Sequence, residues 1–152
     1  MMTITVEAWM RTVAAALAMA AMISLPANFA SADAESPAGT WVMDNGKITV
    51  RLVPCGGNLC GKIVGMKKPL DKKGNPKRDK HNPNPSLRNR PVIGLTIMAN
   101  MKADGDGKWA GEIYNPDDGN TYASYMKLDG DRMKIKGCVA FICEKITFER
   151  VD

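Results

Sequence analysis

Gly39-Thr40-Trp41 begins the part of this chain in which apolar and polar residues alternate, and Arg150 lies at its far end. A guanidinium group over an indole ring is worth about 0.5–2 kcal/mol. In a closed antiparallel barrel the first and last strands are neighbours, so Trp41 and Arg150 would lie side by side. We therefore expect these two residues to close a β-barrel.

Between these ends, the period of two that is typical of half-buried strands recurs several times. The expected inward rows are Ile48, Val50 and Leu52; Ile93, Leu95 and Ile97; Trp109, Gly111 and Ile113; Tyr122, Ser124, Met126 and Leu128; Met133, Ile135 and Gly137; and Ile146 with Phe148. Turns rich in Gly and Asp separate most of them. The pattern predicts an all-β domain over residues 39–152, a small antiparallel up-and-down barrel of about eight strands.

The first 32 residues have the features of a signal peptide. Thr12 to Leu25 is a nearly unbroken apolar run, too short to span a bilayer comfortably, and small residues at 30–32 suit cleavage near Ala32. Translation from Met10 would give the signal peptide a more basic N-terminal region, and the pattern favours this start. We expect a short linker at 33–38, no transmembrane segment after processing, and a periplasmic or secreted protein. A closed barrel has no free edge, so we expect a monomer.

The four cysteines form two local pairs with four residues inside each. In an exported protein this spacing predicts the disulfides Cys55–Cys60 and Cys138–Cys143. A zinc site made of four thiolates is the alternative, but no histidine lies near either pair. A thioredoxin-like redox pair is disfavoured because it needs two intervening residues. We expect no metal and no cofactor.

One long segment, from Lys67 to Pro91, is too polar and too rich in proline for a strand. Its first part has a net charge of +5, equal to the net charge of the whole chain. The basic residues are Lys67, Lys68, Lys72, Lys73, Lys77, Arg78 and Lys80. They form a candidate patch for anionic lipid or an acidic envelope partner, and a solvated loop is the alternative. Nucleic acid is disfavoured because no aromatic residue lies among the lysines.

The second part of the segment predicts a short helical turn, because Asn84 can cap it and Pro85 suits the first helical position. The turn would plug the mouth of the barrel. Arg88 and Arg90 follow it, close in sequence to Asp79, His81 and Asn82. These arginines either hold a ligand carboxylate or phosphate, or fix the plug to the barrel rim through Asp117 or Asp118.

Several motifs resemble a bacterial family known as domain of unknown function 2147. They are Gly39-Thr40-Trp41, Pro54-Cys55-Gly56-Gly57, Cys60-Gly61-Lys62-Ile63, Asp79, Asn82-Pro83, Leu87-Arg88-Asn89-Arg90-Pro91, Gly94-Leu95, Gly111, Ile113-Tyr114-Asn115-Pro116, Asp118-Gly119, Tyr122 and Arg150-Val151. The resemblance covers nearly all of the chain after the signal peptide. It implies an exported protein with a lipocalin-like barrel, in a family without an established activity.

We expect a periplasmic lipocalin-like binding protein for a small apolar or amphipathic ligand, since a barrel of this size can hold one. The candidate ligand-binding residues are Asp79, Asn82, Arg88, Arg90, Trp109, Tyr114, Asn115, Asp118 and Tyr122. A fully packed interior is the alternative. A second expectation is an envelope interaction module that uses the basic loop.

An enzyme is disfavoured by the residues that such a site would need. The chain has one histidine, no serine in a nucleophile-elbow motif, and no cluster of histidines for a metal. Asp79 with Tyr122 is the one candidate acid/base pair. We therefore expect no catalytic residues.

Overall fold

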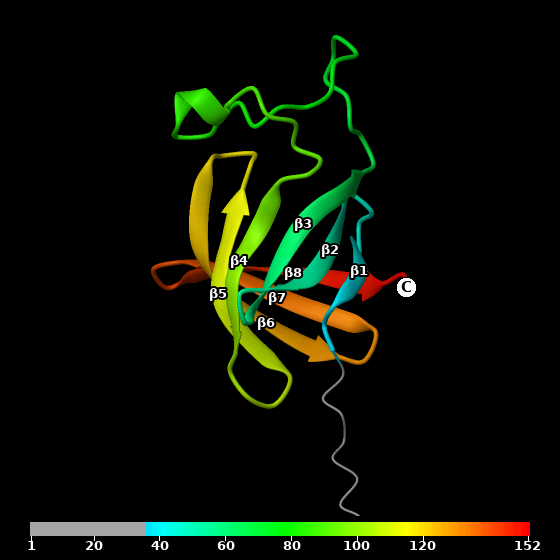
Figure 1. The fold of residues 1–152 in the computed structure, drawn as a ribbon, viewed down its shortest axis with the longest axis vertical. Coiled ribbons are helices and arrows are strands. Elements are labelled where there is room, and N and C mark those ends of the chain that lie inside the picture. The colour runs from blue at the N-terminus through cyan, green and yellow to red at the C-terminus, as the bar shows by residue number, and fades with distance from the viewer. Residues whose placement is uncertain (1–35) are drawn as a thin grey trace, which may run out of the picture. The chain divides into compact units, whose positions relative to one another are not determined.

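The computed structural model describes residues 36–152. Eight antiparallel strands follow one another around a closed barrel, and the first pairs with the last (Figure 1). The strands are β1 (Gly39–Met43), β2 (Ile48–Cys55), β3 (Asn58–Met66), β4 (Thr96–Ala103), β5 (Lys108–Asn115), β6 (Asn120–Asp129), β7 (Arg132–Val139) and β8 (Ile142–Arg150). The predicted all-β up-and-down barrel is confirmed. The predicted signal peptide lies outside the described residues.

The barrel closes where the two ends of the alternating region meet. Trp41 on β1 pairs with Arg150 on β8, and the guanidinium carbon lies 4.3 Å from the centre of the indole ring. The same guanidinium donates to the carbonyl oxygens of Ala38, at 3.1 Å, and Ser36, at 2.9 Å. Trp41 is fully buried, and its Nε1 donates to the Pro37 carbonyl at 2.9 Å. Arg150 therefore holds the segment before β1 over the end of the core.

Large apolar side chains fill the interior of the barrel. The period of two is clear in β6 and β7, where Met126, Met133 and Ile135 are buried and their sequence neighbours are exposed. The side chains that are almost completely buried also include Trp41, Phe148, Leu52, Ile63, Met98 and Met101. Burial of such side chains contributes about 1.5–3 kcal/mol each, so this core is the main source of stability.

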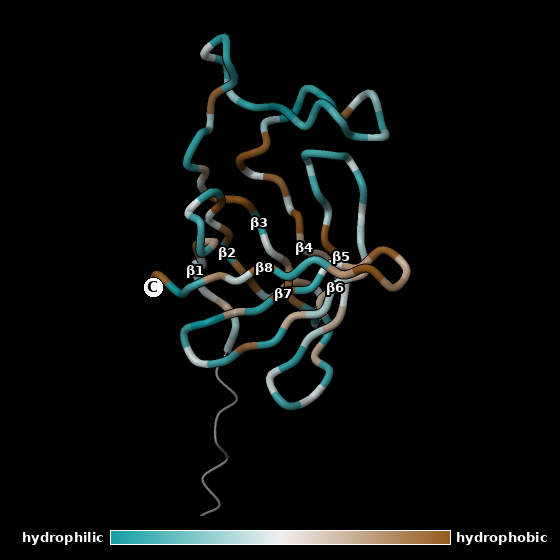
Figure 2. Tube along the Cα trace, turned by 180° about the vertical axis from the view of Figure 1, so that it is seen from behind, coloured by the Kyte–Doolittle hydropathy of each residue, from teal (hydrophilic) through white to brown (hydrophobic). Residues whose placement is uncertain are grey.

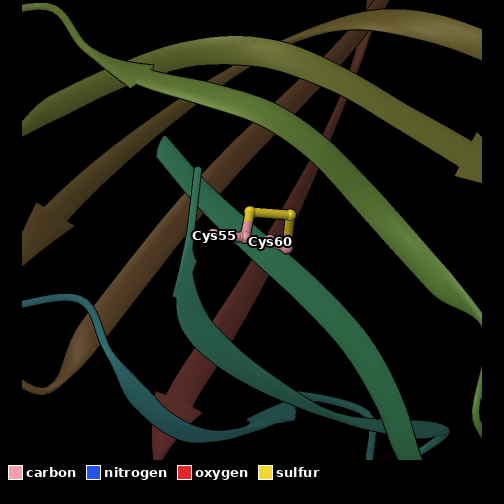
Figure 3. Close-up of a disulfide and its surroundings, with 2 residues drawn as sticks. All are labelled: Cys55 and Cys60. Carbon is pink, nitrogen blue, oxygen red and sulfur yellow. A yellow bond between two sulfur atoms is a disulfide. The ribbon is translucent and has the colours of Figure 1, made fainter. Parts of the chain in front are cut away.

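Both predicted disulfides are present. Cys55–Cys60 joins β2 to β3 at their shared turn, as Figure 3 shows, and Cys138–Cys143 joins β7 to β8. The sulfur atoms bond to each other in pairs rather than to a shared zinc ion, which contradicts the alternative of a four-thiolate site. Disulfides persist in oxidising compartments, so the two bonds fit a protein that works outside the cytoplasm.

The prediction for β4 was wrong in part. Ile93 was expected to point inward with Leu95 and Ile97, but it is 41% exposed and precedes the strand. Gly94 has a φ of +99° and turns the chain there, while its N–H donates to the Ile63 carbonyl at 2.8 Å. Register shifts follow on both sides of β4, and the consecutive residues Ile97 and Met98 are both buried. Bulges of this kind break the period of two.

The segment between β3 and β4 lies beyond one end of the barrel, above the turn that joins β5 to β6 (Figure 1). It contains the predicted helical turn as η2 (Pro85–Leu87), where the Asn84 side chain accepts from the Ser86 N–H at 3.0 Å. The segment folds back on itself, since the Val92 N–H donates to the Lys77 carbonyl at 2.9 Å. We call this segment, residues 67–95, the long loop.

Candidate binding site

A buried carboxylate fastens the long loop to the barrel. Asp79 has no exposed surface. Its Oδ1 accepts from the Tyr114 hydroxyl of β5 at 2.5 Å, and its Oδ2 accepts from Asn82 Nδ2 at 2.8 Å. Arg90 Nε also donates to Oδ2 at 2.9 Å, and Arg90 Nη2 lies 2.8 Å from the same oxygen in an ion pair. Three donors from the loop and the barrel thus satisfy one buried negative charge, as burial of a charge requires.

The protonation state of Asp79 follows from these contacts. Burial opposes ionisation, but the hydrogen bonds from Tyr114, Arg90 and Asn82 together outweigh it and hold the pKa of Asp79 below its ordinary value of 3.8. Burial and the hydrogen bond to Asp79 raise the pKa of Tyr114 above 10.0. At neutral pH the pair is therefore an ionised carboxylate and a neutral phenol, with Arg90 balancing the charge.

The backbone of the loop also sits directly on the turn between β5 and β6. Gly119 is buried and has a φ of +77°, and a Cβ atom placed there would lie 1.9 Å from the His81 carbonyl oxygen. Glycine is required here because both the backbone angle and the close approach exclude a side chain. Within the long loop, Arg88 Nε donates to the carbonyl of Asn82, the residue after His81, at 2.7 Å.

A second cluster lies within the turn itself. Asp118 Oδ2 accepts from the Tyr122 hydroxyl at 2.6 Å and from Asn115 Nδ2 at 2.9 Å, and Oδ1 accepts from the Asn120 N–H at 2.8 Å. Tyr122 therefore pairs with Asp118 and not with Asp79, so the acid/base pair considered from the sequence is not formed.

The expectation that Arg88 and Arg90 fix the plug to the barrel rim through Asp117 or Asp118 was also wrong. Arg90 pairs with Asp79, and Arg88 bonds to a backbone carbonyl within the loop. The plug is held to the rim, but by Tyr114 and the Gly119 contact, because the arginines point back into the loop.

An open hollow of about 1370 Å³ lies between the long loop and the end of the barrel. Its apolar lining comes from Ile48, Met66, Leu70 and Val92. The positively charged lining includes all seven residues of the predicted basic patch together with Lys47, and acidic side chains come from Asp71 and Asp117. The hollow thus combines an apolar lining with a strong excess of positive charge. We call it the loop hollow.

The candidate ligand-binding residues do not converge on one site. Asn115 lines the loop hollow, whereas Asp79, Asn82, Arg90 and Tyr114 bond mainly to one another. Trp109 lies near the start of β5, at the opposite end of the strand from Tyr114, and borders a smaller hollow of about 620 Å³ with Tyr125 and several lysines. The sequence reasoning missed the apolar lining of the loop hollow. Only Ile48 had an indication in the sequence, as the first residue of an inward row.

Two kinds of feature are absent from the part of the chain that the structure describes. Within residues 36–152 no group of three or more His, Cys, Asp or Glu side chains is arranged to hold a metal ion. In the same part of the chain, no helix is long and apolar enough to cross a membrane. The polar groups described above are either paired with one another or lie around the loop hollow.

Comparison with solved structures identifies a similar fold. A protein from the human pathogen Helicobacter pylori, described as belonging to the lipocalin family, superposes with a TM-score of 0.65 at 22% sequence identity. The match covers 77% of this chain and 84% of that protein. At this identity the likeness establishes the fold alone, which is a lipocalin-like barrel. A search of curated proteins found no match.

The sequence also matches a family of bacterial proteins. The profile of that family, described as an uncharacterized protein conserved in bacteria, matches residues 39–150, from the start of β1 to the end of β8. The matched region includes both disulfides, the long loop with its buried Asp79, and the contact of Trp41 with Arg150. The chain belongs to the bacterial family of domain of unknown function 2147.

Proposed function

We propose that this protein is an exported binding protein that holds a small amphipathic ligand with an anionic head group in the loop hollow. The observation that supports this most strongly is the lining of the hollow, in which four apolar side chains face the same space as eight lysine and arginine residues. An anionic head group gains from the positive potential, and an acyl chain gains from removal of apolar surface from water.

The interior of the barrel supports a site at its mouth rather than at its centre. Trp41, Phe148, Met98, Met101 and Met133 are at most 1% exposed and pack together in the core. A ligand at the centre would have to displace these side chains, whereas the loop hollow is already open. The lipocalin-like fold and the two disulfides are consistent with a binding protein of the periplasm.

A calorimetric titration with dodecanoate, below its micellar concentration, tests the site. The variant with Lys67, Lys68, Lys72 and Lys73 changed to Ser should bind about tenfold more weakly than wild type, since each exposed charge contributes up to about 1 kcal/mol. Dodecanol, which lacks the negative charge, should bind wild type more weakly than dodecanoate does.

The matched control changes four strand lysines that do not line the loop hollow, Lys62, Lys102, Lys108 and Lys127, to Ser. It has the same net charge as the loop variant and should bind dodecanoate like wild type. An equal loss of affinity in both variants would mean that net charge, not the hollow, attracts the ligand. Absence of binding by wild type would contradict a site for this class of ligand.

The same basic residues support a second candidate function, contact with an anionic lipid surface or an acidic envelope partner. The observation in its favour is that five of the seven, namely Lys67, Lys68, Lys72, Lys73 and Lys80, are exposed lysines with no salt bridge among the described residues. This function predicts salt-sensitive binding of the loop to anionic vesicles without any uptake of dodecanoate.

A further inference from the structure

The turn between β7 and β8 presents an apolar tip to solvent. Val139, Phe141 and Ile142 are 58%, 92% and 70% exposed, and Ala140 completes the run with a φ of +50°. Figure 2 shows this turn as a hydrophobic projection that extends away from the barrel. We call residues 139–142 the hairpin tip. Consecutive exposed apolar residues on a projecting turn point to an interaction site, in contrast to single exposed ones.

The hairpin tip cannot easily fold back to bury these side chains. Cys138 and Cys143 are opposite each other in the ladder and are joined by a disulfide directly behind the tip. The pairing of Val139 with Ile142 continues the ladder beyond that bond. The tip is therefore held away from the core in a defined conformation, and it needs no ordering before it contacts a partner.

Two lysines lie close behind the tip. Lys136 on β7 is the direct partner of Lys145 on β8, and both are exposed. Neither forms a salt bridge within residues 36–152. Like charges opposite each other destabilise a strand pair. Tyr125 on β6 pairs with Lys136 from the other side and is 54% exposed, so an amphipathic ring lies beside the charges.

We propose that the hairpin tip is a membrane-docking element that inserts Phe141 and Ile142 between the head groups of an anionic bilayer, with Lys136 and Lys145 against the lipid phosphates. Both unfavourable features of the free protein, exposed apolar side chains and a repulsive lysine pair, become favourable at such a surface. Tyrosine is also suited to the head-group region.

A protein partner fits this surface less well. A standard protein interface buries about 800 Å² on each side, which is more than a projecting turn of four residues offers. A bilayer, in contrast, deforms around a small convex element.

Sedimentation with vesicles of phosphatidylglycerol and phosphatidylethanolamine tests this inference independently of ligand uptake. The lipid concentration for half-maximal binding should rise at least about tenfold when Phe141 and Ile142 are changed to Ser, because the inserted apolar surface is lost. The control variant changes Val53 and Val64, which are 43% and 42% exposed on other strands, to Ser and should bind like wild type.

Two further measurements locate the contact. Changing Lys136 and Lys145 to Ser should also weaken sedimentation, and wild type should not sediment with vesicles of phosphatidylcholine alone. In the Phe141→Trp variant, the added emission should shift to shorter wavelength on vesicle binding and should be quenched by brominated acyl chains.

The inference is overturned if the tip variant and its control sediment equally, or if the emission of the added Trp does not respond to the vesicles. It is also overturned if sedimentation depends only on the lysines of the long loop. A concentration-dependent dimer in analytical ultracentrifugation that disappears in the tip variant would show that the tip binds another copy of the chain.

Discussion

Replacement of Asp79 by alanine should lower the free energy of unfolding by about 3 kcal/mol, because removal of one partner from a buried ion pair leaves the other groups unsatisfied. Arg90, Asn82 and the Tyr114 hydroxyl all donate to this carboxylate. The long loop would lose its attachment to β5 and the charge that balances Arg90. Chemical denaturation of wild type and variant at neutral pH measures the difference.

The control for this variant is Asp117→Ala. Asp117 is exposed in the turn between β5 and β6, and its carboxylate accepts no hydrogen bond from the described residues. Its removal should change the free energy of unfolding by less than about 0.5 kcal/mol. If both variants lose the same stability, Asp79 does not anchor the loop.

The effect of Asp79 should depend on pH in a defined direction. The folded state holds the pKa of Asp79 below 3.8, so its contribution is fully present above that value and is lost as the pH falls through the lower, folded pKa. The stability difference between wild type and Asp79→Ala should therefore be constant near neutral pH and shrink under acid conditions. Other aspartates with lowered pKa are common to both proteins and cancel in this comparison.

Arg150→Ala should lower the free energy of unfolding by about 2 kcal/mol, since it removes a cation–π contact over a buried ring. The substitution also removes two hydrogen bonds, those to the Ala38 and Ser36 carbonyls, and uncovers Trp41. Trp41 emission should shift to longer wavelength as water reaches the indole ring. Thermal unfolding and fluorescence of the same sample measure both effects.

Arg132→Ala is a suitable comparison for Arg150→Ala. Arg132 is also on the barrel, but its side chain is 64% exposed. Its Nη2 lies 3.4 Å from Glu149 Oε1. An exposed ion pair of this kind is worth at most about 1 kcal/mol. Equal changes in stability and no change in emission for either variant would contradict the role of Arg150 in closing the barrel.

The strands that were predicted well are those with uninterrupted pairing. β6 and β7 remain in register from the pair of Ala123 with Cys138 to the pair of Asp129 with Arg132. Every second side chain of these strands therefore points inward. β4 has shifts against both neighbours, and Asn100 adopts a φ of +54°. Whether a strand contains a bulge depends on its neighbours, and the alternation of its own residues does not show it.

The sequence indicated which polar residues belong to the site, but not which of them bond to one another. Asp79, Asn82 and Arg90 were recognised as a group, but the one acid/base pair considered from the sequence was Asp79 with Tyr122, whereas Asp79 accepts from Tyr114. The choice depends on how the loop docks, because the turn already engages Tyr122 through Asp118, while the contact of Gly119 with His81 brings Asp79 to Tyr114. Such a contact between distant backbone segments has no pattern in the sequence.

The hairpin tip illustrates a similar limit. The run Val139-Ala140-Phe141-Ile142 is as apolar as a core strand, and its place between two cysteines predicts the disulfide but not the exposure. The tip is exposed because β7 and β8 continue past the rim of the barrel, where no other strand of residues 36–152 covers them. The length of that extension is set by the closure of the whole barrel.

The most direct test of the proposed binding function is the native mass of the protein, purified without denaturant and with both disulfides intact. We predict a reproducible additional mass from an amphipathic anion, released on denaturation and absent from the variant with Lys67, Lys68, Lys72 and Lys73 changed to Ser. A bare polypeptide mass for wild type, or an adduct retained equally by that variant, would contradict a ligand site in the loop hollow.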